Sequence, residues 1–221
     1  MNDPLAGWVA ALAIRFNVHP TVVTLTNMVL AVVGSAVVIF RADHLWSPWL
    51  PGLAAFVLWQ LSYTLDCADG QVARVTGKAS SFGARTDVLV DFLTNSLIIT
   101  ALMTVIAQQV DVPVALLVLG GVMWPLSLLV YLLVRLDGNR GHSFTQRQSG
   151  VITVVKLVRD DGFILLVVGA WLFVDPMTVV LPVAVFCGTQ FLFLLASIGR
   201  EAYLSVRIGP DPDRASTGAT S

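Results

Sequence analysis

Charged residues are scarce in this sequence. Asp, Glu, Lys and Arg make up 12% of the 221 residues, while hydrophobic residues make up 56%. A soluble domain usually has about 25% charged residues, so the composition excludes an ordinary water-soluble domain. It favours an all-α membrane protein, a single bundle whose helices cross the bilayer. The formal net charge of −1 gives no reason to expect a nucleic acid as a partner.

Cysteine is also rare, and no secretory signal is recognisable. The two cysteines are Cys67, inside an acidic segment, and Cys187, inside a late apolar segment, so a structural disulfide is not expected. Near the N-terminus, no basic region leads into an apolar run. Asp3 and Pro4 instead predict the start of a short helix over 3–14. We expect this helix to lie in the membrane interface; the alternative is an N-terminal extension of the first span.

Apolar segments long enough to cross a bilayer account for most of the remaining sequence. About 20 apolar residues cross the hydrocarbon core, and six segments are predicted to do so: 21–40, 49–63, 83–106, 114–134, 163–174 and 178–198. The second continues as a helix into Asp66 and Asp69. We expect 1–208 to form one membrane domain, and the Pro-, Gly-, Ser- and Thr-rich segment 209–221 to be a disordered tail.

The basic residues are distributed unequally between the two sides that six spans define. Only Arg41 lies on the side opposite the termini. Because cytoplasmic loops carry the excess of Lys and Arg, both termini and the acidic segment are predicted to be cytoplasmic, in a protein of the cell membrane. The residues on the cytoplasmic side are Arg15, Arg74, Lys78, Arg85, Arg135, Arg140, Arg147, Lys156, Arg159, Arg200, Arg207 and Arg214.

Four carboxylates occupy the acidic segment, in two pairs. Asp66 and Asp69 are three residues apart, and Asp87 and Asp91 are four apart, so each pair shares one face of a helix. A carboxylate at membrane depth costs about 2.5–3.5 kcal/mol, and four together repel one another. A divalent cation among them removes this repulsion, and oxygen ligands alone favour Mg²⁺ or Mn²⁺ over zinc.

Three interpretations of these acids remain open from the residues alone. Two cations bridged by carboxylates would clamp a pyrophosphate and stabilise its leaving group. The acids could instead be helix-end carboxylates paired with nearby basic residues. They could also form the ion site of an ion- or proton-coupled transporter, although the second half of the chain has no matching acidic pair. In the second interpretation, the basic partners of the acids would be Arg74, Lys78 and Arg85.

The spacing of the acidic segment carries a family resemblance. It reads Asp66-x2-Asp69-Gly70-x2-Ala73-Arg74-x8-Gly83-x3-Asp87-x3-Asp91. This pattern resembles the signature of the CDP-alcohol phosphotransferase family at every fixed position and every gap. The resemblance implies a membrane-bound, divalent-metal-dependent transferase of phospholipid synthesis. Such an enzyme moves a substituted phosphoryl group from a CDP-linked donor such as CDP-diacylglycerol to an alcohol, releases CMP and forms a homodimer.

The resemblance also implies roles for individual residues. Asp66, Asp69, Asp87 and Asp91 would hold two Mg²⁺ or Mn²⁺ ions. Asp91 would also be the general base that deprotonates the acceptor hydroxyl. The nucleotide site would consist of Asp66, Asp69, Gly70, Ala73, Arg74, Gly83 and Thr24, with Arg74 at the diphosphate. For Thr24, a hydroxyl that only bonds back to its own helix is the alternative.

A second basic group follows the fourth span, and we expect it to bind the acceptor. Arg135, Arg140 and Arg147 are our candidates for holding a phosphorylated polyol, either inositol phosphate or glycerol phosphate. A plain positive-inside bias with contacts to lipid headgroups explains the same residues. The segment 135–150 does not match the further basic patterns of the members that use either acceptor.

Overall fold

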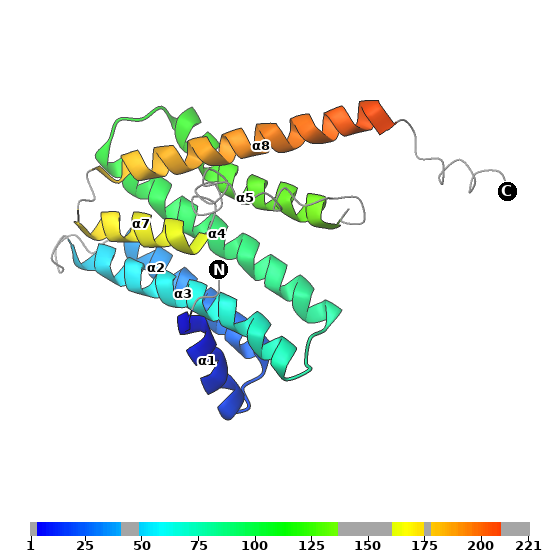
Figure 1. The fold of residues 1–221 in the computed structure, drawn as a ribbon. Coiled ribbons are helices and arrows are strands. Elements are labelled where there is room, and N and C mark those ends of the chain that lie inside the picture. Colours follow the sequence, from blue (N-terminus) through cyan, green and yellow to red (C-terminus); the bar gives the residue numbers. More distant parts are fainter. Residues whose placement is uncertain (1–3, 41–48, 137–160, 175–177, 209–221) are drawn as a thin grey trace.

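The computed structural model describes residues 4–40, 49–136, 161–174 and 178–208. Over these residues the chain is helical, with no strand (Figure 1). The helices are α1 (Pro4–Arg15), α2 (Pro20–Ile39), α3 (Leu50–Val75), α4 (Ser81–Gln109), α5 (Val114–Leu136), α7 (Asp161–Val174) and α8 (Val180–Ile208). The all-α prediction is confirmed for this part of the chain. The predicted tail at 209–221 lies outside the described residues.

Helices α2 and α3 form an antiparallel pair at the centre of the fold. Gly34 allows their close approach, because a Cβ at this position would lie 3.0 Å from the indole ring of Trp59. Ser35 accepts a hydrogen bond of 3.3 Å from Nε1 of that tryptophan. Both residues are fully buried, so this contact fixes the separation and the register of the two helices.

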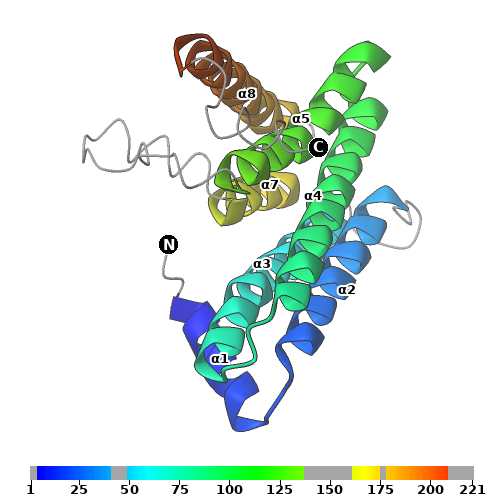
Figure 2. The same ribbon diagram turned by 90° about the vertical axis from the view of Figure 1, so that its right-hand side faces the viewer.

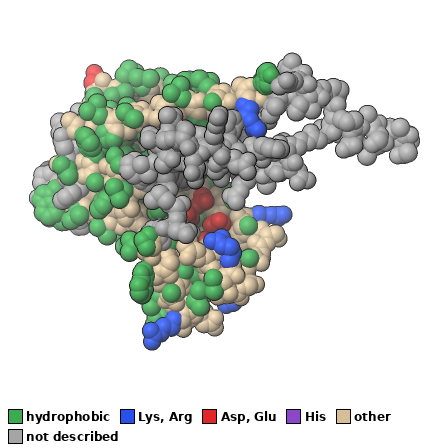
Figure 3. Space-filling model, viewed as in Figure 1, with side chains coloured by type: hydrophobic (Ala, Val, Ile, Leu, Met, Phe, Trp, Pro, Cys, Tyr) green, Lys and Arg blue, Asp and Glu red, His purple; other side chains and the backbone are tan. Residues whose placement is uncertain are grey.

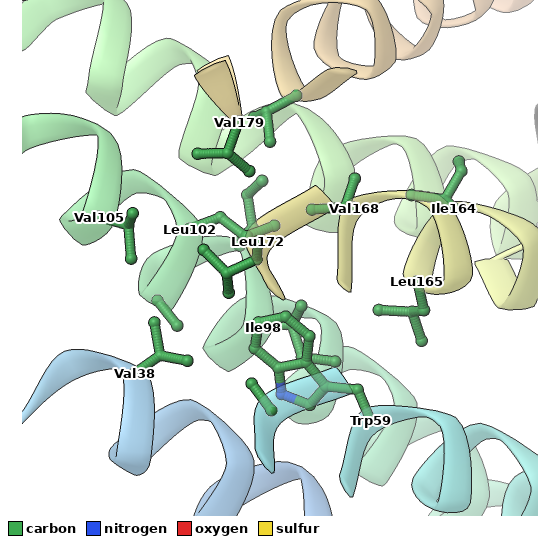
Figure 4. Packing of buried hydrophobic residues seen from close by; sticks show 14 of the residues in the cluster. Val38, Trp59, Ile98, Leu102, Val105, Ile164, Leu165, Val168, Leu172 and Val179 are labelled. Atoms are coloured by element: carbon green, nitrogen blue, oxygen red, sulfur yellow. The ribbon is translucent and has the colours of Figure 1, made fainter. Parts of the chain in front are cut away.

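The main hydrophobic core surrounds the same tryptophan. Figure 4 shows Trp59 of α3 beside Ile98 of α4, with Leu165 of α7 close by and with Leu102 of α4 and Leu172 of α7 next to each other further into the same cluster. Helices α5 and α8 join this core through a T-shaped pair of aromatic rings, Trp124 and Phe186, whose centroids are 4.8 Å apart. Burial of these large side chains supplies most of the favourable packing between the helices.

Helix α7 lies against α3 through two glycines that are seven residues apart. A Cβ at Gly162 would come within 2.2 Å of the Tyr63 ring, and one at Gly169 within 2.9 Å of the Phe56 ring. Seven residues return to the same face of a helix. The two glycines therefore form a groove for two aromatic side chains of α3, and α7 runs antiparallel to it.

Helix α1 packs across the C-terminal end of α3 (Figure 2). Its buried face consists of Ala6, Ala10 and Ala13, while Trp8 and Leu12 on the other face are exposed. This two-faced helix is the one predicted at 3–14, and its exposed apolar side suits a membrane interface. The structure contains no membrane, so the interfacial position stays a prediction.

Some helix ends differ from the predicted ones. Helix α4 begins at Ser81 rather than near Gly83, because the hydroxyl of Ser80 caps the new helix by accepting a 3.0 Å hydrogen bond from the Gly83 amide. Helix α8 continues to Ile208, ten residues beyond the predicted end at 198. Hydropathy marks where a chain leaves lipid, whereas a helix can continue into water.

Three of the described helices are long and apolar enough to cross a membrane: Pro20–Ile39, Ser81–Gln108 and Val180–Arg200. Many large apolar side chains on these helices are exposed, as expected for surfaces that face lipid tails. The chain is therefore a helical membrane protein. The number of six spans stays a prediction, because α7 as described has only 14 residues, about 21 Å of helix.

Candidate metal and nucleotide site

Three of the four predicted acidic residues meet at one point in the fold. Asp66 and Asp69 lie near the C-terminal end of α3, and Asp87 lies in the second turn of α4. One carboxylate oxygen from each residue lies within 4.8 Å of the other two. The short connection between α3 and α4 reverses the direction of the chain. The acidic residues of α3 therefore face those of α4.

Asp91 completes this group, which we call the acidic cluster. It lies one turn after Asp87 on α4, and its carboxyl group is within hydrogen-bonding reach of that of Asp66. Asp69 is buried, with 4% of its surface exposed, and the other three are partly buried. Figure 3 shows acidic side chains in a hollow of the surface, with Lys and Arg side chains beside it.

The charges around the cluster are mostly of one sign. The groups whose charge acts on Asp69 are Asp87 and Asp66, and Asp66 likewise acts on Asp87. Lys78, which could have paired with these acids, instead donates a 3.4 Å hydrogen bond to Oδ1 of Asn17. Four carboxylates that are partly desolvated and repel one another would be stabilised by a cation.

The spacing of the oxygens can be compared with the needs of such a cation. Two oxygens on one Mg²⁺ are at most about 4.2 Å apart, because each ligand distance is about 2.0–2.1 Å. Separations of up to 4.8 Å need only small rotations of the side chains to reach this limit. They also suit a pair of ions about 3.5–4 Å apart with bridging carboxylates. The residues present therefore fit one or two hard divalent cations.

Helix α2 supplies the neutral side of the cluster. The hydroxyl of Thr24 is within hydrogen-bonding distance of Oδ2 of Asp69 and of the Pro20 carbonyl. Thr24 is buried, with 6% of its surface exposed. Its contact with the predicted nucleotide site therefore runs through Asp69, and a direct contact with the nucleotide stays a prediction.

Two residues that contact the acidic cluster, directly or through one another, were not among the predicted site residues. Nδ2 of Asn27 donates a 3.3 Å hydrogen bond to Oδ1 of Asp66, and the hydroxyl of Ser62 donates to Oδ1 of Asn27. Asn27 and Ser62 are each 2% exposed. The available signal was an Asn inside an apolar span, one helical turn after Thr24.

The predicted nucleotide residues of α3 lie in its last two turns. The guanidinium group of Arg74 folds back over Gly70, where an added Cβ would lie 3.2 Å from Nη1. Arg74 is exposed and Ala73 is partly exposed. A small residue and an exposed cation therefore stand next to Asp69, on the accessible side of the acidic cluster.

Gly83 lies in the first turn of α4, where a Cβ would meet the Ser80 hydroxyl at 3.1 Å. The need for a small residue here therefore has a local cause, the helix cap. Of the predicted acceptor residues, Arg135 lies in the last turn of α5, and its side chain is outside the described part of the structure. Arg140 and Arg147 lie outside the described residues.

Comparison with known proteins agrees with this geometry. A family model described as CDP-alcohol phosphatidyltransferase matches residues 17–190, which include α2, α3 and the whole acidic cluster. A phosphatidylinositol phosphate synthase from Corynebacterium glutamicum is 34% identical over 109 residues. That alignment covers 49% of this chain and 46% of the relative, so it spans about half the length of each protein.

Proposed function

The chain belongs to the CDP-alcohol phosphatidyltransferase family, and from this premise we propose that it transfers a phosphatidyl group from CDP-diacylglycerol to an alcohol and releases CMP. The observation that carries the proposal is the meeting of Asp66, Asp69 and Asp87 within 4.8 Å. These residues belong to the spaced motif, so the motif and the geometry point to the same chemistry. Family membership favours this activity over the transporter interpretation.

Asp66, Asp69 and Asp87 would hold the cations, with Asp91 beside them. Bound Mg²⁺ or Mn²⁺ ions supply positive charge that neutralises the diphosphate and stabilises the departing CMP. The protein's own contribution is to keep these carboxylates converged on two different helices. The core around Trp59, which both helices share, keeps that convergence rigid.

Asp91 is the residue we propose as general base. An alcohol is a weak nucleophile at neutral pH and needs a base within hydrogen-bonding reach. Asp91 takes the hydroxyl proton while the acceptor oxygen forms a bond to the β-phosphorus of the donor. The bond between this phosphorus and the bridging oxygen breaks, and CMP leaves with the electron pair.

The nucleotide would lie on the accessible side of the cluster, above the last turns of α3. Gly70 and Ala73 leave room for the diphosphate, and Arg74 is placed to offset its charge. Gly83, at the start of α4, would border the same space. Thr24 would contribute indirectly. Its hydroxyl donates a hydrogen bond to the Asp69 carboxylate and would hold that carboxylate in place.

We propose inositol phosphate as the acceptor ahead of glycerol phosphate. The printed name of the Corynebacterium glutamicum relative, a phosphatidylinositol phosphate synthase, supports this order. Arg135, Arg140 and Arg147 remain the candidates for binding the acceptor phosphate. We further propose a homodimer in the cell membrane, with residues 1–208 as one domain and with the site and both termini in the cytoplasm.

The proposal is tested with the purified full chain, CDP-diacylglycerol, Mg²⁺ and separate acceptors: inositol phosphate, glycerol phosphate, free inositol and serine. We expect CMP release only with a phosphorylated polyol, its loss on chelation with EDTA, and recovery when Mg²⁺ is restored. Asp91→Asn should lower the rate at least about 100-fold, the usual contribution of a positioned base.

Asp111→Asn is the matched control, because Asp111 is an exposed carboxylate just beyond the opposite end of α4. This variant should keep the wild-type rate. Absence of CMP release with every acceptor, with Mg²⁺ and again when Mn²⁺ replaces it, would overturn the proposal. Release with serine alone would keep the reaction class and overturn the acceptor.

A further inference from the structure

A chain of three side chains connects the interior of the bundle to the acidic cluster. Ser62 of α3 donates to Asn27 of α2, and Asn27 donates to Asp66 one turn further along α3. Asn27 is 2% exposed and lies in a helix of mean hydropathy 2.3. A buried amide is costly unless its groups are paired, and here both ends of the amide have a partner.

The Asp66 carboxylate determines which way the Asn27 amide faces, because an ionised carboxylate can only accept hydrogen bonds, whereas the Ser62 hydroxyl can donate or accept. Nδ2 therefore points at Asp66, and Oδ1 accepts from the Ser62 hydroxyl. The flipped amide would place Oδ1 against a carboxylate oxygen, and two acceptors in contact repel. Asn27 is thus a donor toward Asp66 in a single orientation, and Ser62 pairs with the buried Oδ1 that would otherwise lack a donor.

A neutral donor suits a carboxylate that must also bind a cation. Lys or Arg at position 27 would neutralise Asp66 and compete with the cation, whereas an amide fixes the carboxylate and leaves its charge. Asn27 contacts Oδ1 of Asp66, and the same carboxylate lies within hydrogen-bonding reach of Asp91, so Asp66 is held between α2 and the rest of the acidic cluster. Groups that orient metal ligands in this way typically change metal affinity or activity 10–100-fold when removed.

The pairing of α2 with α3 has a second contact besides these three side chains. Gly34 and Ser35 fix the two helices against Trp59 two turns away. We propose that Asn27 is a positioning residue that orients the Asp66 carboxylate for cation binding, and that Ser62 anchors Asn27 through the hydrogen bond to its Oδ1. The inference rests on the proposed function, because it assigns these residues to the same metal-dependent site.

The test measures Mn²⁺ binding to the purified full chain in detergent, without donor or acceptor. Electron paramagnetic resonance of free Mn²⁺ gives the affinity directly. Asn27→Leu should weaken it about 10–100-fold, and Ser62→Ala should weaken it less. Ser62→Thr keeps the hydroxyl and should recover most of the affinity. The control is Thr26→Val, since Thr26 is exposed on the same helix and bonds only to the Val22 carbonyl.

A purely structural role would change other quantities. Asn27→Leu would then lower the thermal midpoint while Mn²⁺ affinity stayed at the wild-type value, and that result overturns the inference. If Asn27→Leu does not fold, unchanged affinity in Ser62→Ala overturns it equally. Absence of Mn²⁺ binding by the wild type also overturns it. A wild type that binds Mn²⁺ but releases no CMP refutes the proposed function alone, and the comparison of affinities still decides the role of Asn27.

Discussion

Every carboxylate of the acidic cluster has a different set of neighbours. Asp69 is buried and bonded to Thr24, Asp66 is bonded to Asn27, and Asp87 and Asp91 border the accessible side. Two neutral side-chain donors, Thr24 and Asn27, come from α2, and the nearby cations Arg74 and Lys78 are exposed. This arrangement keeps four negative charges available to an external cation, which is the property that a metal-dependent transferase requires.

Arg74 allows a test of the nucleotide side at the scale of single residues. Charge-assisted hydrogen bonds contribute about 1.5–3 kcal/mol, so Arg74→Ala should lower kcat/KM for the CDP-linked donor about 10–100-fold. Gly70→Ala should cause a smaller loss, because an added Cβ would displace the guanidinium group, 3.2 Å away, by a few tenths of an ångström. Steady-state kinetics with varied donor measures both.

Arg85→Ala is the matched control, because Arg85 is exposed near the start of α4 and is equally basic. Its kcat/KM should equal that of the wild type. Equal losses in Arg74→Ala and Arg85→Ala would mean that general basic charge, rather than a contact of Arg74, attracts the donor.

The residues that could be predicted from the sequence are those at short, fixed spacing. Asp66 and Asp69 lie on one helix and Asp87 and Asp91 on another, so helical geometry alone placed each pair on one face. Asn27 and Ser62 could not be assigned in this way. Their contact depends on the register between α2 and α3, which is set by distant packing at Gly34 and Trp59.

At the scale of helices, glycines control how closely neighbours approach. Gly34 on α2 faces Trp59, Gly169 on α7 faces Phe56, and Gly120 on α5 lies against Met103 of α4. Each of these three contacts lies between helices of the same chain.

Gly34→Ala tests the register of α2 and α3. The new Cβ would lie 3.0 Å from the Trp59 ring and 3.1 Å from Leu58, and Trp59 is fully buried and cannot move aside. Overpacking of this kind costs about 1–3 kcal/mol. The free energy of unfolding in mixed detergent micelles should fall by this amount.

Gly188→Ala is the control for that variant. Gly188 is in α8, and nothing lies within 4 Å of a Cβ built there. Its free energy of unfolding should stay the same or rise by up to about 1 kcal/mol, the helix preference of Ala over Gly. Equal destabilisation of both variants would contradict the importance of the α2–α3 contact.

Helix positions could be predicted from the sequence better than helix ends. The apolar segments at 21–40 and 114–134 correspond closely to α2 and α5, because lipid-facing and core-facing residues are both apolar. The start of α4 depends on a hydroxyl cap at Ser80, and α8 continues through Arg200. Neither the Ser80 cap nor the continuation of α8 changes the hydropathy profile in the way that the end of a membrane span does.

At the scale of the whole molecule, the acidic cluster lies toward one end of the bundle. The α3–α4 connection lies at this end, and the α4–α5 connection follows the other end of α4. Helix α4 has 29 residues, about 43 Å of helix, which exceeds the hydrocarbon thickness of about 30 Å. The two connections should therefore face opposite sides of the membrane.

Labelling of introduced cysteines tests this orientation. Cys67 and Cys187 are free thiols and are first replaced by Ala. Ala79→Cys lies in the α3–α4 connection and Asp111→Cys in the α4–α5 connection, both exposed positions. A membrane-impermeant maleimide should label Asp111→Cys in intact cells, and Ala79→Cys only after the cells are opened. The reverse pattern would place the site outside the cytoplasm.

The central claim is that the acidic cluster directs an alcohol to the β-phosphorus of a CDP-linked lipid. The most direct measurement supplies the purified protein with CDP-diacylglycerol that carries radioactive phosphorus at the β-position, Mg²⁺ and inositol phosphate. The account predicts that the label appears in a new lipid that contains the acceptor, while the CMP released is unlabelled. Label that remains in a water-soluble cytidine nucleotide, or equal transfer by Asp91→Asn, would contradict it.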